Sequence, residues 1–251
     1  VAAAIVPALL LMAFAHAVHL AEWFPDTGRP WYELVAWLPA LAFALFTLRR
    51  VEVAALPRAV LTGLHVGLVW AFCLVAGSEF VAFVAREVPE GVWQVCAGGV
   101  VPAIILLVLS RIAPRPAWPL GAFERAYLGI APLPLAGFLA LWLFLCLWGR
   151  GDPSPLPYIP VLNPLDLTLA LGVTALIVWV RALRARQVAP VPMPRPVVML
   201  VAVLLALFLW WNVALLRGLH HLGGYGFSLD DFLWDRTLQK CLAAGWIVFT
   251  A

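Results

Sequence analysis

The sequence is poor in charge: charged residues make up 12% of its 251 residues, against about 25% in ordinary soluble domains. Apolar residues make up 65%. A soluble fold needs a polar exterior that this composition cannot supply, whereas a bilayer acts as an apolar outer solvent. The net charge of +3 is spread over short loops, which argues against a nucleic-acid partner. We therefore expect an all-α, polytopic transmembrane helix bundle that forms one region over residues 1–251.

Several motifs that carry chemistry are also missing. The sequence has no Walker loop, no dinucleotide glycine motif, no HExxH and no GxSxG. Nucleotide hydrolysis is therefore excluded as far as motifs can exclude it, and no cofactor is predicted. Cys73, Cys96, Cys146 and Cys241 lie far apart without a CxxC, so small buried apolar side chains are favoured over a disulfide or a metal site.

What the sequence does contain is a series of apolar runs. A helix of about 20 apolar residues crosses a hydrocarbon core of about 30 Å. The last run starts at Cys241 and has 11 residues, or about 16 Å of helix, and Val1 is not an initiator methionine. We expect a fragment of a longer protein, with about eight membrane segments and the last one truncated. The seven complete runs are Val1–Leu20, Tyr32–Leu48, Ala59–Val84, Val92–Ser110, Ala126–Trp148, Leu165–Val180 and Val197–Leu216.

Basic residues alternate between the loops. Loops 49–58, 111–125 and 181–195 carry ten, and the other loops carry six together with most of the acids. Loops rich in arginine and lysine stay in the cytoplasm. We therefore expect a multi-pass protein of the bacterial cytoplasmic membrane, with residue 1 on the cytoplasmic side and loops 149–165 and 217–240 outside.

The fifth run contains two prolines, Pro132 and Pro134, each of which removes a backbone donor. The freed carbonyls need partners from protein or from a water-filled cavity. A proline kink is the favoured interpretation, and a broken helix that lines a transport site is the alternative.

The most distinctive string is LPYIPVLNPLDL, residues 156–167. Asn163 suits a helix N-cap, Pro164 the first helical position, and Asp166 the position from which a carboxylate reaches back to the cap. The string thus predicts a rigid start to the sixth span. The functional alternative has Tyr158, Asn163 and Asp166 facing a ligand at the outer interface.

A second string, residues 211–221, contains Asn212, Arg217, His220 and His221 at the end of the seventh run. Cations are favoured at a helix C-terminus, and an arginine side chain can reach the interface from there. That interpretation covers Arg217 better than it covers two adjacent histidines. The functional alternative is an anion-binding patch for a phosphate or carboxylate at the outer leaflet. No ligand spacing specifies a metal site.

Ionisable residues also lie within the apolar runs. His16 and His19 approach the outer end of the first run and are expected to be interfacial, with a ligand path as the alternative. His65 and Glu79 lie deeper in the third run, 14 residues apart and so on nearly the same face. Such groups are costly in a membrane and usually face the bundle interior. Both are candidate site residues without an assigned role.

At these strings the chain resembles the bacterial membrane-protein family known as domain of unknown function 2339. Members carry an LPYxPxLNPLDL segment, matched by Leu156–Leu167, and then an asparagine followed by R…HH. A glutamine that begins a span bearing a tryptophan comes next, and the order and spacing fit over 156–246. The resemblance implies an integral membrane protein, longer than this chain, and supplies no established activity. The matched residues of the later motifs are Asn212, Arg217, His220, His221, Gln239 and Trp246.

Three functions follow as hypotheses. The leading one is an outward-facing site that handles an anionic or lipid-linked envelope molecule. Whether it catalyses a reaction is left open, because acid–base geometry cannot be read from a sequence. The alternatives are a transporter or channel that uses the proline-broken span, and a non-catalytic membrane scaffold. The site of the leading hypothesis consists of Asn163, Asp166, Asn212, Arg217, His220, His221 and Gln239.

Overall fold

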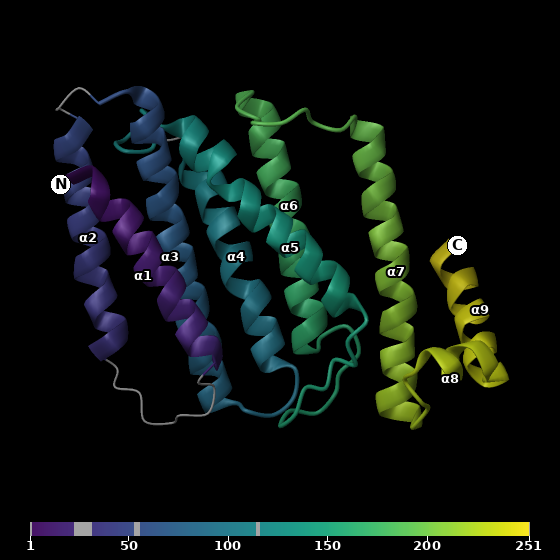
Figure 1. Ribbon diagram of the computed structural model, residues 1–251. Coiled ribbons are helices and arrows are strands. Elements are labelled where there is room, and N and C mark those ends of the chain that lie inside the picture. Colours follow the sequence, from purple (N-terminus) through teal and green to yellow (C-terminus); the bar gives the residue numbers. More distant parts are fainter. Residues whose placement is uncertain (1, 23–31, 53–55, 114–115, 251) are drawn as a thin grey trace.

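A computed structural model describes residues 2–22, 32–52, 56–113 and 116–250, and within these ranges it contains helices and no strands. The helices run up and down in a row (Figure 1). Most begin and end close to the limits of a predicted apolar run, although the fifth run is divided into two helices. The short helix Leu229–Trp234 lies within the predicted loop 217–240. The helices are α1 (Ala2–Glu22), α2 (Tyr32–Glu52), α3 (Arg58–Glu87), α4 (Trp93–Ile112), the π-helix η1 (Arg125–Ile130), α5 (Pro132–Leu147), α6 (Pro164–Arg186), α7 (Pro196–Gly223), α8 (Leu229–Trp234) and α9 (Arg236–Thr250).

Five helical segments in the described ranges are long and apolar enough to cross a membrane: α3, α4, η1 with α5, α6 and α7. The all-helical class is thus confirmed, but the predicted count of about eight segments is not. Among the described side chains of α1 the apolar stretch is Ala4–His19, which is too short to be counted as a span, and α9 has 15 residues. A helix of 15 residues rises about 22 Å, less than the hydrocarbon thickness of about 30 Å.

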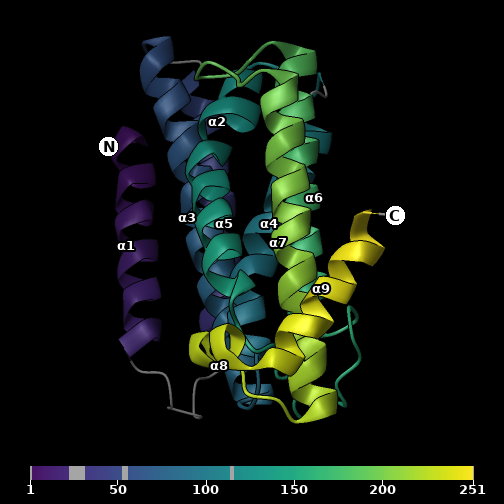
Figure 2. The same cartoon turned by 90° about the vertical axis from the view of Figure 1, so that its right-hand side faces the viewer.

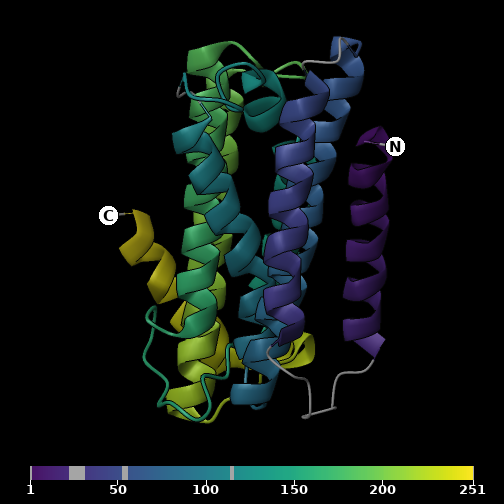
Figure 3. The ribbon, with the colours of Figure 1, turned by 90° about the vertical axis from the view of Figure 1, so that its left-hand side faces the viewer.

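The core lies between α3, α4, α5 and α6, where Leu106, Leu128, Leu139 and Leu165 are fully buried. Figure 2 and Figure 3 show α1 on the side of the bundle away from α9. Large apolar side chains cover much of the outer surface; Leu11, for example, is 70% exposed. Such a surface is stable where the surrounding solvent is hydrocarbon, so the fold is that of a membrane-embedded bundle.

The proline pair lies where the π-helix η1 gives way to α5. Pro132 has no N–H to donate to the carbonyl of Leu128, and the Trp179 indole of α6 donates to that oxygen instead, at 2.8 Å. The Trp70 indole of α3 donates to the Ala131 carbonyl at 2.9 Å. The irregular turn therefore has its partners inside the protein, as an irregular backbone in a membrane requires.

The bundle has two ends, which differ in composition. We call the end where α2, α4 and α6 finish the arginine end, because segments 49–52, 56–58, 111–113 and 181–195 meet there (Figure 1). We call the opposite end, where α3, α5 and α7 finish and α6 begins, the junction end. The strings 156–167 and 211–221 both lie at the junction end.

Candidate functional site

The N-terminus of α6 starts the site. The Asn163 side-chain oxygen accepts from the Asp166 backbone N–H at 3.0 Å, and Pro164 occupies the first helical position. The Asn163 side-chain amide also donates to the Asp166 carboxylate. The predicted capping arrangement is thereby confirmed. It fixes the Asp166 carboxylate in the first turn of α6, where the residue is 2% exposed.

Arg217 of α7 is the partner of that carboxylate. Its side chain is fully buried, and its Nη1 donates to Asp166 Oδ1 at 2.5 Å. The other two guanidinium nitrogens donate to backbone carbonyls at the end of α5. Nη2 donates to Leu147 O at 2.5 Å, and Nε donates to Gly149 O at 2.8 Å. One arginine thus ties α7 to α6 and α5. We call Asn163, Asp166 and Arg217 the junction.

The junction is closed by two further groups. Trp210, about two turns before Arg217 on α7, donates its indole N–H to Asp166 Oδ1 at 2.8 Å. Gly151 adopts φ +69°, and a Cβ at that position would lie 3.2 Å from Cδ of Arg217. A glycine is therefore required both by the backbone conformation and by the close approach of the arginine. The buried ion pair has its hydrogen-bond partners, which offsets the cost of removing both charges from water.

Two histidines and a tyrosine lie at the edge of the junction. His221 Nε2 donates to the Arg150 carbonyl at 2.9 Å, and the Tyr158 ring stacks on the His221 ring with centroids 4.2 Å apart. His220 Nδ1 donates to the Tyr225 carbonyl at 2.6 Å. A neutral imidazole that donates through one nitrogen is an acceptor through the other. Each histidine therefore retains one ring nitrogen that can meet a ligand.

The Tyr158 hydroxyl is the one buried side-chain polar atom in the described residues that has no hydrogen-bond partner of normal geometry, although the Asn163 side chain lies near it. Burial and the Asp166 carboxylate raise the pKa of the Tyr158 phenol, and they outweigh Arg217 and the Asn163 side chain, which lower it. The hydroxyl therefore stays protonated and can donate a hydrogen bond. A buried polar group without a partner is unusual enough in folded proteins to need an explanation.

Two residues of the predicted site lie elsewhere. Asn212 Oδ1 accepts from the Trp246 indole of α9 at 2.5 Å, and its amide donates to the Phe208 carbonyl. Gln239 donates to the Leu233 carbonyl at 2.6 Å, at the turn between α8 and α9. The structure thus brings Tyr158, Asn163, Asp166, Arg217 and His221 together. It places Asn212 in the contact between α7 and α9, and Gln239 in the α8–α9 turn.

The intramembrane candidates fall into two separate places. His16 Nε2 lies 2.5 Å from Glu79 Oε1, and the His16 ring packs against Trp37. His19, about one turn further along α1, is exposed. His65 lies toward the arginine end, fully buried, and does not share a partner with Glu79. The helix spacing that relates His65 to Glu79 therefore does not bring them into one site.

His65 belongs to a network that the sequence did not predict. Its Nε2 donates to Glu52 Oε1 at 2.9 Å, and its Nδ1 lies 2.8 Å from the Tyr127 hydroxyl. The Trp118 indole donates to the second Glu52 oxygen at 2.8 Å. When the neutral imidazole carries its hydrogen on Nε2, Nδ1 accepts a hydrogen bond from the Tyr127 hydroxyl. We call Glu52, His65 and Tyr127 the histidine network.

No metal centre is formed within the described ranges, where no three His, Cys, Asp or Glu side chains come close enough to hold an ion. The thiols of all four cysteines are free.

Taken together, the five apolar membrane-length helices and the buried polar junction between them define a multi-pass integral membrane protein. The chain belongs to the family described as "Predicted membrane protein (DUF2339)", which it matches over residues 1–251. The match extends through the first 150 residues, where the sequence strings gave no specific resemblance. No curated protein and no solved structure matches the chain.

Proposed function

We propose that the protein handles an anionic or lipid-linked envelope molecule at the junction end, which faces outward across the bacterial cytoplasmic membrane. The observation that carries this proposal is the buried Tyr158 hydroxyl without a partner, beside the half-buried His221 ring. A phosphate or carboxylate oxygen of the ligand accepts from the hydroxyl, and the second ring nitrogen of each histidine offers a further hydrogen-bonding position.

Arg217 has a different role from the one that its position in the sequence suggests. Because its guanidinium is buried and bound to Asp166 and two carbonyls, it does not contact the ligand. It is a positioning residue: it holds the end of α7, and with it His221, against the loop that carries Tyr158. The anion patch therefore consists of the tyrosine and the histidines, supported by the junction.

Lipid mass spectrometry tests the proposal on protein taken from native membranes into nanodiscs. Tyr158→Phe removes only a hydroxyl that has no hydrogen-bond partner of normal geometry. His221→Phe keeps the stacked ring but removes its nitrogens, one of which donates to the Arg150 carbonyl. Tyr225→Phe, at the same end, is the matched control. We expect one anionic or isoprenoid-linked lipid to be enriched with the wild type and with the control. Both site variants should lose this lipid while the amount of protein in the membrane stays unchanged. Bulk lipid alone in every sample would contradict the proposal and favour a scaffold.

A transport function is the second candidate, and the His16–Glu79 pair favours it. The two side chains lie 2.5 Å apart and are 13% and 17% exposed, in a region of apolar helices where ionisable pairs often form proton paths. Proton flux into liposomes that hold the protein is the measurement. Glu79→Gln should abolish the flux, whereas Glu87→Gln, at an exposed acid on the same helix, should not. Flux that survives Glu79→Gln would exclude this role for Glu79.

A further inference from the structure

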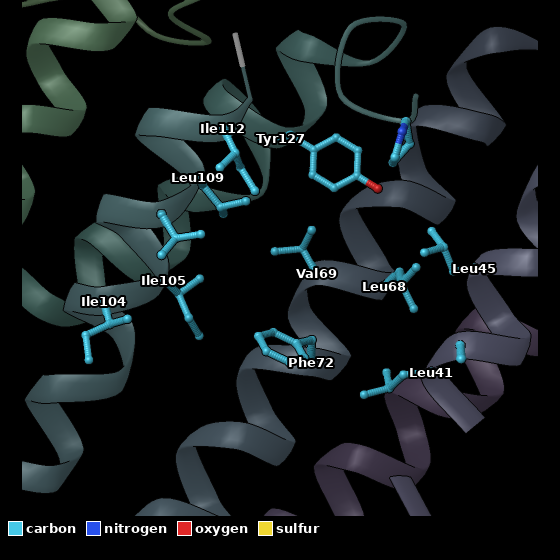
Figure 4. A pocket seen from close by; sticks show the side chains of 13 residues that line it. Leu41, Leu45, Leu68, Val69, Phe72, Ile104, Ile105, Leu109, Ile112 and Tyr127 are labelled. Carbon is cyan, nitrogen blue, oxygen red and sulfur yellow. The ribbon is translucent and has the colours of Figure 1, made fainter. Parts of the chain in front are cut away.

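A cavity of about 490 Å³ lies in the membrane-embedded part of the bundle, between α2, α3 and α4. Figure 4 shows side chains from the three helices pointing toward one another around it, with Tyr127 at one end. The volume falls in the range of about 300–1,000 Å³ that is typical of small-molecule sites. It is lined mainly by Leu41, Leu45, Val69, Phe72, Ile105 and Leu109, with the Tyr127 ring.

The walls of the cavity are apolar. The one polar side-chain atom among the lining residues is the Tyr127 hydroxyl, and the histidine network holds that hydroxyl against His65. Some lining side chains are also open to the outside: Phe72 is 46% exposed, Ile104 47% and Val108 46%. At this depth the outside is hydrocarbon, so the cavity is open to lipid. Its apolar walls lack the polar partners that a bound water needs.

We propose that this cavity binds one hydrocarbon chain of an anionic membrane lipid, with the headgroup at the arginine end beside Arg49. The lining residues Leu41 and Leu45 are followed four residues later by Arg49, so that all three lie on one stripe of α2. The Arg49 guanidinium lies 5.2 Å from the centre of the Trp118 ring, and the next residue, Pro119, lines the cavity.

The charge around this position favours an anion. Glu52, the carboxylate three residues after Arg49 on α2, has its two oxygens bound to His65 and Trp118, so it is turned into the protein. Arg58 and Arg111 lie at the same end of the bundle. Each arginine near the surface attracts an anionic lipid by about 1 kcal/mol. This site lies at the opposite end from the junction, and it does not depend on the function proposed there.

The hydrocarbon part is tested by filling the cavity. The full chain is placed in nanodiscs with equal amounts of phosphatidylglycerol and phosphatidylcholine, and native mass spectrometry counts the lipids that remain bound on release. Val108 and Val95 are both on α4 and both 46% exposed, but only Val108 lines the cavity. We expect one retained lipid in the wild type and in Val95→Trp, and none in Val108→Trp. Equal retention in both variants overturns the proposal.

The headgroup part is tested at two adjacent arginines. Arg49 lies over Trp118 beside the cavity, whereas Arg50 lies over Phe46, which does not line it. Arg49→Gln should reduce the preference for phosphatidylglycerol about fivefold, and Arg50→Gln should leave it unchanged. Equal effects of the two variants, or no preference in the wild type, overturn the anionic assignment. If the wild type is a dimer and Val108→Trp dissociates it, the occupant of the cavity is a second copy of the chain, and the lipid assignment is overturned.

Discussion

The two buried polar networks lie at opposite ends of the bundle and differ in their chemistry. The junction pairs Arg217, which stays charged at every accessible pH, with Asp166. The histidine network joins His65, whose imidazole donates through one nitrogen and accepts through the other, to a carboxylate and a phenol. A permanent ion pair makes a fixed connection, whereas an imidazole between two partners can rearrange its protons without losing its contacts.

The networks also differ in how much packing surrounds them. His65 of the histidine network lies on α3, and 50% of the apolar stretch of this helix is buried inside the bundle. The junction holds α7, for which the corresponding share is 11% and whose main helix contact is with α9 (Figure 1). Apolar burial therefore supports the first network independently, while α7 depends on the junction to stay against α5 and α6. Loss of the junction should consequently have the larger effect.

Arg217→Met gives the largest expected loss. It leaves the Asp166 carboxylate buried without its cation, which costs about 3–5 kcal/mol in the free energy of unfolding. Unfolding in detergent, followed by tryptophan fluorescence, measures it. Adding Asp166→Asn to Arg217→Met should recover part of the loss, because the uncompensated charge is removed. Arg181→Met, at an exposed arginine on α6, should stay within about 0.5 kcal/mol of the wild type.

His65→Leu should cost less. It leaves the buried Tyr127 hydroxyl without its partner, which costs about 1–3 kcal/mol for one unsatisfied polar group. One Glu52 oxygen also loses its partner, but the Glu52 side chain is 17% exposed and can be solvated. Glu52 keeps the Trp118 indole as a donor, which limits the penalty. The same unfolding measurement applies. If His65→Leu lost as much free energy of unfolding as Arg217→Met, the expected difference between the junction and the histidine network would be wrong.

Local features were predictable from the sequence because their partners lie nearby in the chain. The helices follow the apolar runs, and the Asn163 cap involves residues three positions apart. The Asp166–Arg217 pair joins residues 51 positions apart, and each residue had a sufficient local explanation: a cap for Asp166, a helix dipole for Arg217. Nothing in either string indicated that both were buried against each other.

The histidine network shows a second limit. Glu52 follows two arginines at the end of an apolar run, which is typical of a solvated loop, so only the packing of α2 against α3 reveals it as a partner of His65. The prediction that His65 and Glu79 lie on nearly the same face used the period of one helix. Their actual partners come from α1, α2 and η1, which the period of α3 cannot locate.

Tyr158→Phe gives the smallest expected change in stability, and it separates structure from function at the junction. Its hydroxyl has no hydrogen-bond partner of normal geometry, so the free energy of unfolding should stay within about 0.5 kcal/mol of the wild type. Trp210→Phe is the contrast: it also removes one polar group from an aromatic side chain, but this indole N–H donates to the Asp166 carboxylate and its loss should cost about 1.5–3 kcal/mol. If both variants lose equal stability, the Tyr158 hydroxyl has a structural partner after all. By contrast, if the Tyr158→Phe protein keeps its stability but loses its lipid, the hydroxyl contributes to ligand binding and not to stability.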